Sequence, residues 1–243
     1  MRTIAVIQAR MGSTRLPGKV LADLSGQPML ARVVARTARA SLLDGVVVAT
    51  TASPTDDIIA ETCMRYHWQF FRGNEDDVLD RYYQAAKHYA AETVVRVTGD
   101  CPLIDPEIIN RVVAVFQETM PDYASNTLRR TYPRGLDVEA MKLKSLARAW
   151  REASEPWHRI HVTPYIYQNP KLFSLVSVTD ETDHSSYRWT VDTQQDLEFM
   201  RSIYTLLHGG DTFSWRDVLK LLNEDPKLGN MNRDVVQKTP QEC

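Results

Sequence analysis

The sequence predicts an α/β protein with a mixed, mainly parallel sheet and helices on both faces. Apolar segments of strand length alternate with segments of helical period through the first half of the chain, which is the order found in parallel sheets. Residues 46–49 are continuously apolar, as is typical of a strand buried on both faces. The 243 residues, 43% of them hydrophobic, are enough for one large domain with a packed core.

The first half of the chain is expected to alternate strictly between strand and helix. Pro28 and the Ser53–Pro54 pair have the residue types that favour the start of a helix. Strands are expected at residues 4–7, 46–49, 68–71 and 93–97, and helices from 28, over 53–67, near 79–90 and from 105 to about 116. Ligands of such sheets bind at the carboxyl ends of the strands. The polar loops at residues 8–19, 50–53 and 98–102 are therefore the expected site.

The second half is less regular. Strands are expected at residues 123–126, 136–141, 172–178 and 187–191, and helices over 142–153, 193–207 and 214–222. A polar tail with scattered prolines follows from residue 223, and we expect it to be loosely ordered.

Composition excludes several classes of protein. The net charge of −2 argues against duplex nucleic acid as a partner. The three cysteines, Cys63, Cys101 and Cys243, are odd in number and far apart, which argues against disulfides or structural zinc. The first apolar stretch is too short for a signal peptide, and no stretch reaches the ~20 residues of a membrane helix. We expect a cytoplasmic protein without a membrane partner.

The loop at residues 8–19 is the first candidate site. It holds Gly12 and Gly18, which allow close backbone approach to a ligand, and three cations, Arg10, Arg15 and Lys19. Such a loop suits the phosphates of a nucleotide, although a solvated turn has the same composition. It is not a Walker-type P-loop, because five residues separate its glycines.

Two aspartates stand where a predicted strand ends. Asp100 follows the strand at 93–97, and a carboxylate facing a phosphate loop suits a magnesium ion. Asp192 follows the strand at 187–191. Either residue could instead only cap the element that comes next.

The predicted loop at residues 127–135 is rich in arginine and precedes another pair of acids. Asp137 and Glu139 are two apart on one predicted strand, so both are expected on the same side. With Arg129 and Arg134 they would suit an acidic acceptor, or they are a solvated strand face. His158 and His161 lack the spacing of a zinc motif, and we interpret them as structural.

Several motifs together resemble one family. The opening Ile7-Gln-Ala-Arg-Met-Gly-Ser-Thr-Arg-Leu-Pro-Gly-Lys19 is similar to the signature of the cytidylyltransferases that activate acidic sugars, the CMP-Kdo and CMP-acylneuraminate synthetases. Arg96-Val-Thr-Gly-Asp-Cys-Pro-Leu-Ile104, Tyr132-Pro-Arg-Gly-Leu-Asp-Val-Glu139 and Val191-Asp-Thr193 extend the likeness. The chain most resembles the SpsF-type branch of spore coat polysaccharide biosynthesis proteins, up to about residue 222.

The resemblance implies a nucleotide-diphospho-sugar transferase fold, similar to GT-A glycosyltransferases and Rossmann-like. It implies one nucleotidyltransferase domain over residues 1–222, with a nucleotide-binding half at 1–120, an acceptor-binding and dimerisation half at 121–222, and a tail at 223–243. It also implies a homodimer formed through residues 157–167, although that apolar segment would equally suit the core.

The resemblance further assigns roles to residues. It places CTP on Ala9, Arg10, Gly12, Ser13, Arg15, Lys19 and Thr98, and Mg²⁺ on Asp100 and Asp192. Arg10, Lys19 and Asp100 would act in catalysis, and Asn126, Arg129, Arg134, Asp137 and Glu139 would bind the sugar acceptor. The implied reaction transfers CMP to that sugar and releases pyrophosphate. A glycosyltransferase that uses a nucleotide sugar and a nucleotide-binding scaffold without turnover remain alternatives.

Overall fold

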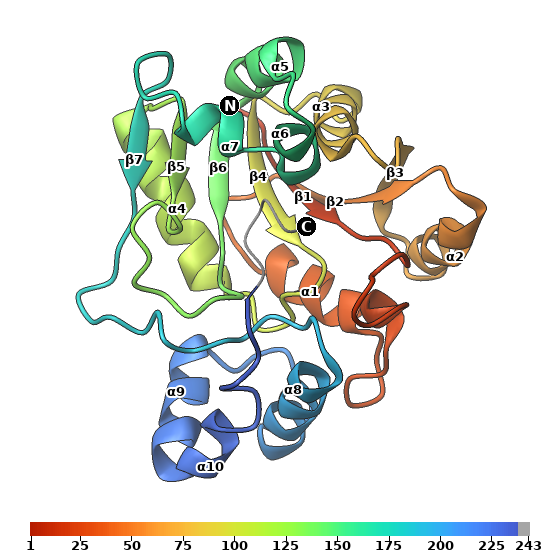
Figure 1. The fold of residues 1–243 in the computed structure, drawn as a ribbon, viewed down its shortest axis with the longest axis vertical. Helices are drawn as coiled ribbons and strands as arrows, with labels where there is room; N and C mark the ends of the chain where they lie inside the picture. The colour runs from red at the N-terminus through yellow and green to blue at the C-terminus, as the bar shows by residue number, and fades with distance from the viewer. Residues whose placement is uncertain (238–243) are drawn as a thin grey trace.

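One seven-stranded sheet organises the chain, in the order β3-β2-β1-β4-β6-β5-β7 (Figure 1). The computed structural model describes residues 1–237. The strands are β1 (Thr3–Gln8), β2 (Gly45–Thr51), β3 (Gln69–Gly73), β4 (Thr93–Thr98), β5 (Tyr123–Ser125), β6 (Glu139–Lys142) and β7 (Leu175–Ser177). The first four pair in parallel, and β6 pairs antiparallel with both β4 and β5, so the predicted mixed, mainly parallel sheet is confirmed.

Strand β1 lies at the centre of the parallel part of the sheet. It pairs with β2 on one side and with β4 on the other, and Gln8 at its end is level with Thr98 at the end of β4. The loops that follow these two strands therefore begin side by side. This register brings residues 9–19 and 99–102 together, as parallel strand order predicts.

Helices cover both faces of the sheet because side chains alternate along each strand. In β1, Ala5 and Ile7 belong to a core shared with α1, α2, α4, α8 and α9, whereas Ile4 and Val6 face a core with α3, α5 and α7. The helices are α1 (Met29–Ala38), α2 (Asp57–Arg65), α3 (Val78–His88), α4 (Pro106–Thr119), α5 (Leu143–Glu152), α6 (Pro156–His161), α7 (Pro164–Tyr167), α8 (Gln194–Leu206), α9 (Trp215–Glu224) and α10 (Pro226–Gly229), with short 3₁₀ turns at Lys19–Leu21 and Pro54–Asp56.

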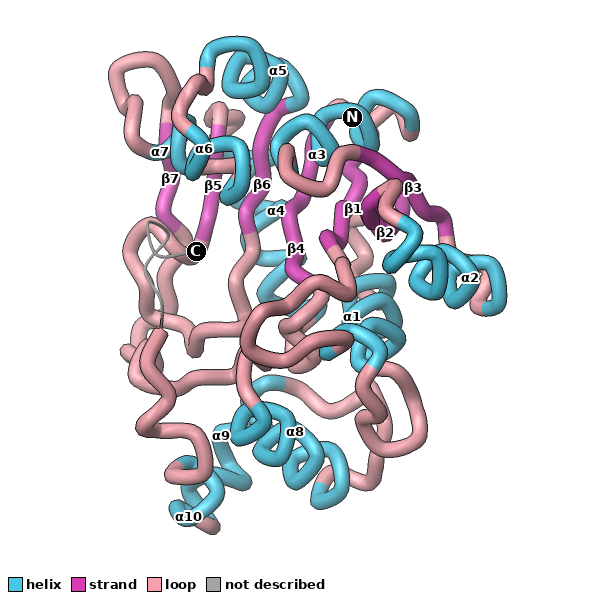
Figure 2. Tube along the Cα trace, turned by 45° about the vertical axis from the view of Figure 1, so that its right-hand side comes forward, coloured by secondary structure: helices cyan, strands magenta, loops and turns pink. Residues whose placement is uncertain are grey.

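The last three helices gather beyond the end of the sheet at which β1 and β4 finish (Figures 1 and 2). Long loops fill the space between those strand ends and α8. Within residues 1–237, the longest helix is α4 with 14 residues, and none is long and apolar enough to cross a membrane.

Three predicted features differ from the structure. Residues 136–138 precede β6 instead of belonging to it, and residues 187–191 form an extended segment with a single bridge, between Arg134 and Arg188. The described part of the tail is folded, because Leu228 of α10 and Asn232 are buried against the domain. The rest of the predicted tail, residues 238–243, lies outside the described residues. The many polar residues of this segment predicted a loose tail, whereas the burial of a few side chains such as Leu228 fixes residues 225–237 to the domain.

The apolar segment at residues 157–167 folds against its own chain. Val162 and Ile166 are fully buried in the core beneath α3 and α5. This burial accounts for the apolar pattern within one chain, and a role of the segment in a homodimer stays a prediction.

Candidate active site

A cavity of about 500 Å³ opens where β1 and β4 end. The loop after β1 lines the cavity, and so do residues 98–100 at the end of β4. Asp192 comes from the segment just before α8, and Ile160 with His161 comes from α6. The cavity therefore joins segments from both halves of the chain at the position that parallel strand order predicted.

The loop after β1 is a folded ring and not a loose turn. The Met11 carbonyl accepts hydrogen bonds from Ser13 N at 2.8 Å and from Gly18 N at 2.9 Å. Gly18 has a φ of 72°, which a residue with a side chain rarely adopts, and it leads into the 3₁₀ turn that begins at Lys19. Met11 N donates to Asp56 at 2.7 Å, which ties the ring to the turn after β2. Lys19 is thereby directed from a fixed backbone.

Lys19 lies between the two predicted metal ligands. Its Nζ donates to Asp100 Oδ2 at 2.7 Å, to Asp192 Oδ1 at 2.8 Å and to the Val191 carbonyl at 2.7 Å. The two carboxylates come from separate strand ends, yet both reach one nitrogen. They are 81 and 173 residues from Lys19 in sequence, so only the fold brings them together.

This contact shifts the ionisation of all three groups. Burial opposes the charge on Asp100, but the ammonium of Lys19 outweighs it and lowers the Asp100 pKa. The pKa of Asp192 is lowered against burial in the same way by Lys19, with help from Arg188. Burial also opposes the charge on Lys19, and the two carboxylates outweigh it, so the Lys19 pKa is raised. All three groups are charged at neutral pH.

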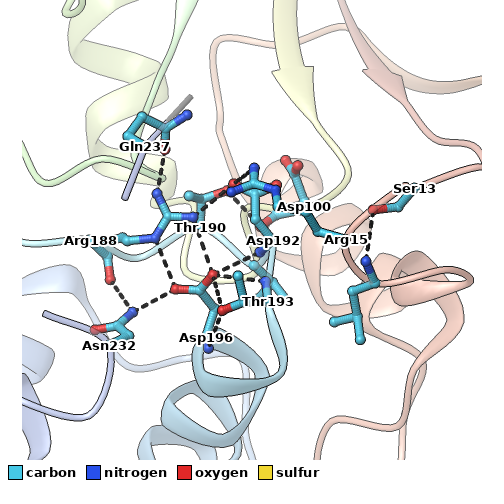
Figure 3. Close-up of polar contacts among 12 residues, drawn as sticks. Ser13, Arg15, Asp100, Arg188, Thr190, Asp192, Thr193, Asp196, Asn232 and Gln237 are labelled. Carbon is cyan, nitrogen blue, oxygen red and sulfur yellow. Dashed lines mark hydrogen bonds and ion pairs between the residues drawn. The ribbon is translucent and has the colours of Figure 1, made fainter. Parts of the chain in front are cut away.

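Two more cations reach Asp192. Arg15 contacts Asp192 Oδ2 at 2.9 Å and Arg188 contacts the same oxygen at 2.8 Å (Figure 3). Arg188 also pairs with Asp196 at 2.9 Å. The cluster thus holds three cations and three carboxylates, and its charges balance.

Asp196 anchors this cluster to α8. It is fully buried, and with Thr193 it forms a reciprocal capping box at the start of the helix. It also accepts a hydrogen bond from Asp192 N at 3.0 Å, and Asn232 donates to it at 2.9 Å. The N-cap residue of α8 is thus Thr193 and not Asp192. The sequence alone did not decide whether Asp192 is a cap, and in the structure its backbone N–H is bound by Asp196 of the capping box.

The residues predicted to bind the nucleotide all line the cavity. Arg10 is exposed and has no hydrogen bond or ion pair to another described residue. Ala9 N donates to Ala49 O at 3.1 Å, and the predicted contact of the Ala9 backbone with the base stays a prediction. The Ser13 hydroxyl accepts from Leu16 N at 3.4 Å (Figure 3). Thr98 contacts Cys101, whose thiol is buried, and burial raises the pKa of that thiol.

The residues predicted to bind the acceptor lie elsewhere, and within residues 1–237 none of the five lines this cavity. Asn126 is buried, and its amide bonds the backbone of residues 136 and 138. Glu139 is buried in a network with Arg96, Tyr123 and Thr163. The expectation that Asp137 and Glu139 share one strand face is wrong, because β6 begins at Glu139.

The arginines of the loop at residues 127–135 also lie apart from the main cavity. Asp137 forms a two-pronged ion pair with Arg130, at 2.5 and 2.8 Å. Arg129 is exposed, and Arg134 lines a second, smaller cavity. The arginines of this loop and the acids after it predicted an acceptor-binding site. The sequence could not show that Arg130 and Asp137 pair with each other.

Several cavity residues carried no predicted role. Glu75 lines it from the loop before α3, and Arg81 from the first turn of that helix. His161, which we interpreted as structural, lines it from α6. Val162, immediately after His161, has a φ of 73° in the left-handed region, which is unusual for a β-branched residue. Such backbone costs roughly 1–3 kcal/mol and is common at functional sites. No feature of the local sequence reveals that strain.

The two aspartates suit magnesium by their chemistry. Mg²⁺ binds oxygen ligands and usually takes one or two carboxylates together with phosphates and water. Asp100 and Asp192 offer two carboxylates that already converge on a single cation, the ammonium of Lys19. Among the described residues, no three acidic, histidine or cysteine side chains are placed so that they could hold a metal ion together. A magnesium ion on these two aspartates would therefore take phosphate and water as its other ligands.

Comparison with known proteins agrees with this geometry. A family model for cytidylyltransferases matches residues 4–215 of the chain. The chain belongs to the cytidylyltransferase family. It is 35% identical to an uncharacterised protein of Methanocaldococcus jannaschii over 100% of this chain and 99% of that one. It is also 32% identical to the spore coat polysaccharide biosynthesis protein SpsF of Bacillus subtilis, over 91% of this chain and 94% of that one. The similarity thus extends past residue 222.

Solved structures show the same fold. A cytidylyltransferase from Leptospira borgpetersenii matches with a TM-score of 0.91 and 32% identity, over 98% of this chain and 100% of that one. A CMP-2-keto-3-deoxy-manno-octonic acid synthetase solved with CTP matches with a TM-score of 0.66 and 20% identity, over 85% of this chain and 100% of that one. The predicted nucleotide-diphospho-sugar transferase fold is confirmed for this cytidylyltransferase.

Proposed function

We propose that this cytidylyltransferase transfers CMP from CTP to a hydroxyl of an acidic or related sugar, of the nonulosonate or Kdo-like kind, and releases pyrophosphate. The observation that carries the proposal is the convergence of Asp100 and Asp192 on Lys19, at the end of a loop that holds two further cations. The similarity to a polysaccharide biosynthesis protein supports a surface sugar as the acceptor.

Charge balance in the cluster indicates how the nucleotide would bind. Arg15 and Lys19 are neutralised by aspartates, so a triphosphate must compete for them. Arg10 has no described partner and would meet the phosphates first. Transfer of Lys19 and Arg15 from carboxylate to phosphate would then free Asp100 and Asp192 for a divalent cation.

The chain's residues would stabilise an in-line displacement. The acceptor hydroxyl loses its proton to solvent and its oxygen forms a bond to the α-phosphorus. The bond from the α-phosphorus to the bridging β-phosphate oxygen breaks, so pyrophosphate leaves with the electron pair. Arg10, Arg15 and Lys19 would stabilise the charge that develops on the leaving group. A magnesium ion on Asp100 and Asp192 would supply charge neutralisation at the α-phosphate.

The direct test follows pyrophosphate release from CTP and Mg²⁺ with a panel of nonulosonic, Kdo-like and phosphorylated sugars. Asp100→Asn and Asp192→Asn are expected to lower the rate by at least about tenfold, because each removes charge-assisted contacts. Asp234→Asn is the matched control, since Asp234 is exposed and does not line the cavity. Full activity in Asp100→Asn would refute the metal-site assignment.

The same panel separates the alternatives. Release of a nucleoside phosphate from a nucleotide sugar, without pyrophosphate, would identify a glycosyltransferase. Tight CTP binding with no pyrophosphate from any sugar would identify a scaffold. Both outcomes contradict CMP transfer.

A further inference from the structure

A second cavity, of about 150 Å³, lies between residues 185–189 and residues 229–237. We propose that it is a binding site for a small oxyanion, a phosphate or carboxylate group. The site does not depend on CMP transfer. Its volume equals that of cavities known to admit a six-atom ring, so a free anion or one carried on a small molecule has room.

The charge of the cavity favours an anion. Three arginines line it, Arg134, Arg188 and Arg233, and no carboxylate belongs to its lining among the described residues. Guanidinium groups bind phosphate and carboxylate with two parallel hydrogen bonds, which makes arginine the side chain best suited to such ligands. The net charge of the whole chain is −2, so this concentration of positive charge is local.

The lack of a partner for the Arg134 side chain is the observation that supports the site most strongly. This side chain is half-buried, yet it forms no hydrogen bond or ion pair with any described residue. Burial and the nearby charge of Arg130 lower its pKa, although the carboxylate of Asp137 acts in the opposite direction. A half-buried cation without a hydrogen-bonding partner is unfavourable until an anion pairs with it. Arg233 is likewise without a described partner, whereas Arg188 is already paired with Asp192 and Asp196.

The hydroxyl of Ser186 adds a neutral donor to the site. Ser186 lines the cavity, is exposed, and its side chain has no hydrogen bond to another described residue. The indole Nε1–H of Trp189 also lacks an acceptor among the described residues, but it is fully buried and offers no surface to a ligand.

The backbone around the cavity is fixed, so the donors are positioned in advance. Arg134 N donates to Tyr187 O at 3.0 Å, and Trp189 N donates to Arg134 O at 2.6 Å. The two segments approach so closely that a side chain at Gly135 would lie 2.3 Å from the Trp189 carbonyl oxygen. This contact keeps Arg134 and Trp189 on one wall.

Arg188 connects the two cavities. It lines the smaller cavity, and its guanidinium contacts Asp192 of the active site (Figure 3). An anion that engages Arg188 weakens its hold on Asp192. Occupancy of the second cavity therefore changes the contacts of Asp192 in the active site.

The test uses hydrogen exchange measured by mass spectrometry, because it locates binding along the chain. Sodium phosphate, and in a separate arm sodium glucuronate, is titrated at constant ionic strength made up with sodium chloride. We expect protection of residues 185–189 and 229–237. Arg134→Gln and Arg233→Gln are each expected to weaken this response by at least about tenfold in anion concentration.

Arg129→Gln is the matched control, because Arg129 belongs to the same loop but does not line the cavity. Unchanged exchange elsewhere in each unliganded variant shows that it is folded. A response to phosphate alone identifies a free anion as the ligand, and a response to glucuronate alone identifies a carboxylate-bearing molecule. Protection confined to residues 8–19, or equal responses in the wild type and both cavity variants, overturns the proposal.

Discussion

Replacement of Lys19 by methionine would test the central contact of the site. The change removes an ammonium that donates to Asp100, to Asp192 and to a backbone carbonyl, all within 2.8 Å, and it keeps a chain of similar length. A charge-assisted hydrogen bond contributes roughly 1.5–3 kcal/mol. Loss of one such bond to the departing pyrophosphate corresponds to about one to two decades in rate.

The same variant should change cation binding in the opposite direction. In the resting cluster Lys19 occupies the point on which both carboxylates converge, so a divalent cation must displace it. Without the ammonium, Asp100 and Asp192 retain their negative charge with fewer partners. We therefore expect Lys19→Met to bind Mn²⁺ more tightly than the wild type in the absence of CTP, by about tenfold or more.

Two assays separate these effects. Pyrophosphate release measures transfer, and electron paramagnetic resonance of Mn²⁺ measures free cation without requiring activity. Lys171→Met is the control, because Lys171 is exposed and far from the cavity lining. Mn²⁺ affinity no higher than that of the wild type would show that Lys19 does not compete for the aspartates. An unchanged transfer rate would show that it does not act on the phosphates.

Three further predictions concern stability, measured by urea unfolding. Gly135→Ala should cost at least about 1–3 kcal/mol, because the residue has a φ of 104° and a new Cβ would meet a carbonyl oxygen at 2.3 Å; Gly229→Ala, which has open space, should cost far less. Asn232→Ala should cost about 1–3 kcal/mol, since its amide bonds both Arg188 O and Asp196 at 2.9 Å; an unchanged midpoint would contradict this. Burial opposes the charge on Asp196, but Arg188 outweighs it and lowers the Asp196 pKa. The resulting stability is complete above the unfolded pKa of about 3.9 and is lost as pH falls through the lower folded value, and Asp196→Asn should remove that part of the acid dependence.

The fold could be predicted because each parallel strand and its helix are specified locally. The apolar run at 46–49 and the proline and serine signals before the helices gave the right order, and β1, β2, β3 and β4 follow it. Residues 187–191 look like a strand, but they pair with a neighbour at only one residue, Arg188. Pairing depends on what lies beside a segment, which local sequence does not specify.

The site could be predicted where it depends on the ends of strands. Residues after β1 and β4 must meet, so the loop at 8–19 and Asp100 were found together. The residues predicted for the acceptor do not follow parallel strands, because 126–139 belong to a loop and an antiparallel strand, and their role in acceptor binding stays a prediction. There, Asn126 and Glu139 satisfy buried backbone and side-chain groups. Polar residues of that kind are indistinguishable in sequence from a binding surface.

The balance of charges in the resting site explains why its cations and acids occur together. An isolated pair of converging carboxylates would repel and take up protons, and an isolated group of loop cations would repel in the same way. Packed against each other, Lys19, Arg15 and Arg188 keep Asp100, Asp192 and Asp196 ionised and in place. In the proposed function, a triphosphate would pair with the cations of this cluster and a divalent cation with its carboxylates. The cluster would then exchange its internal ion pairs for ion pairs with the two ligands, and binding of either ligand alone should be weaker than binding of both.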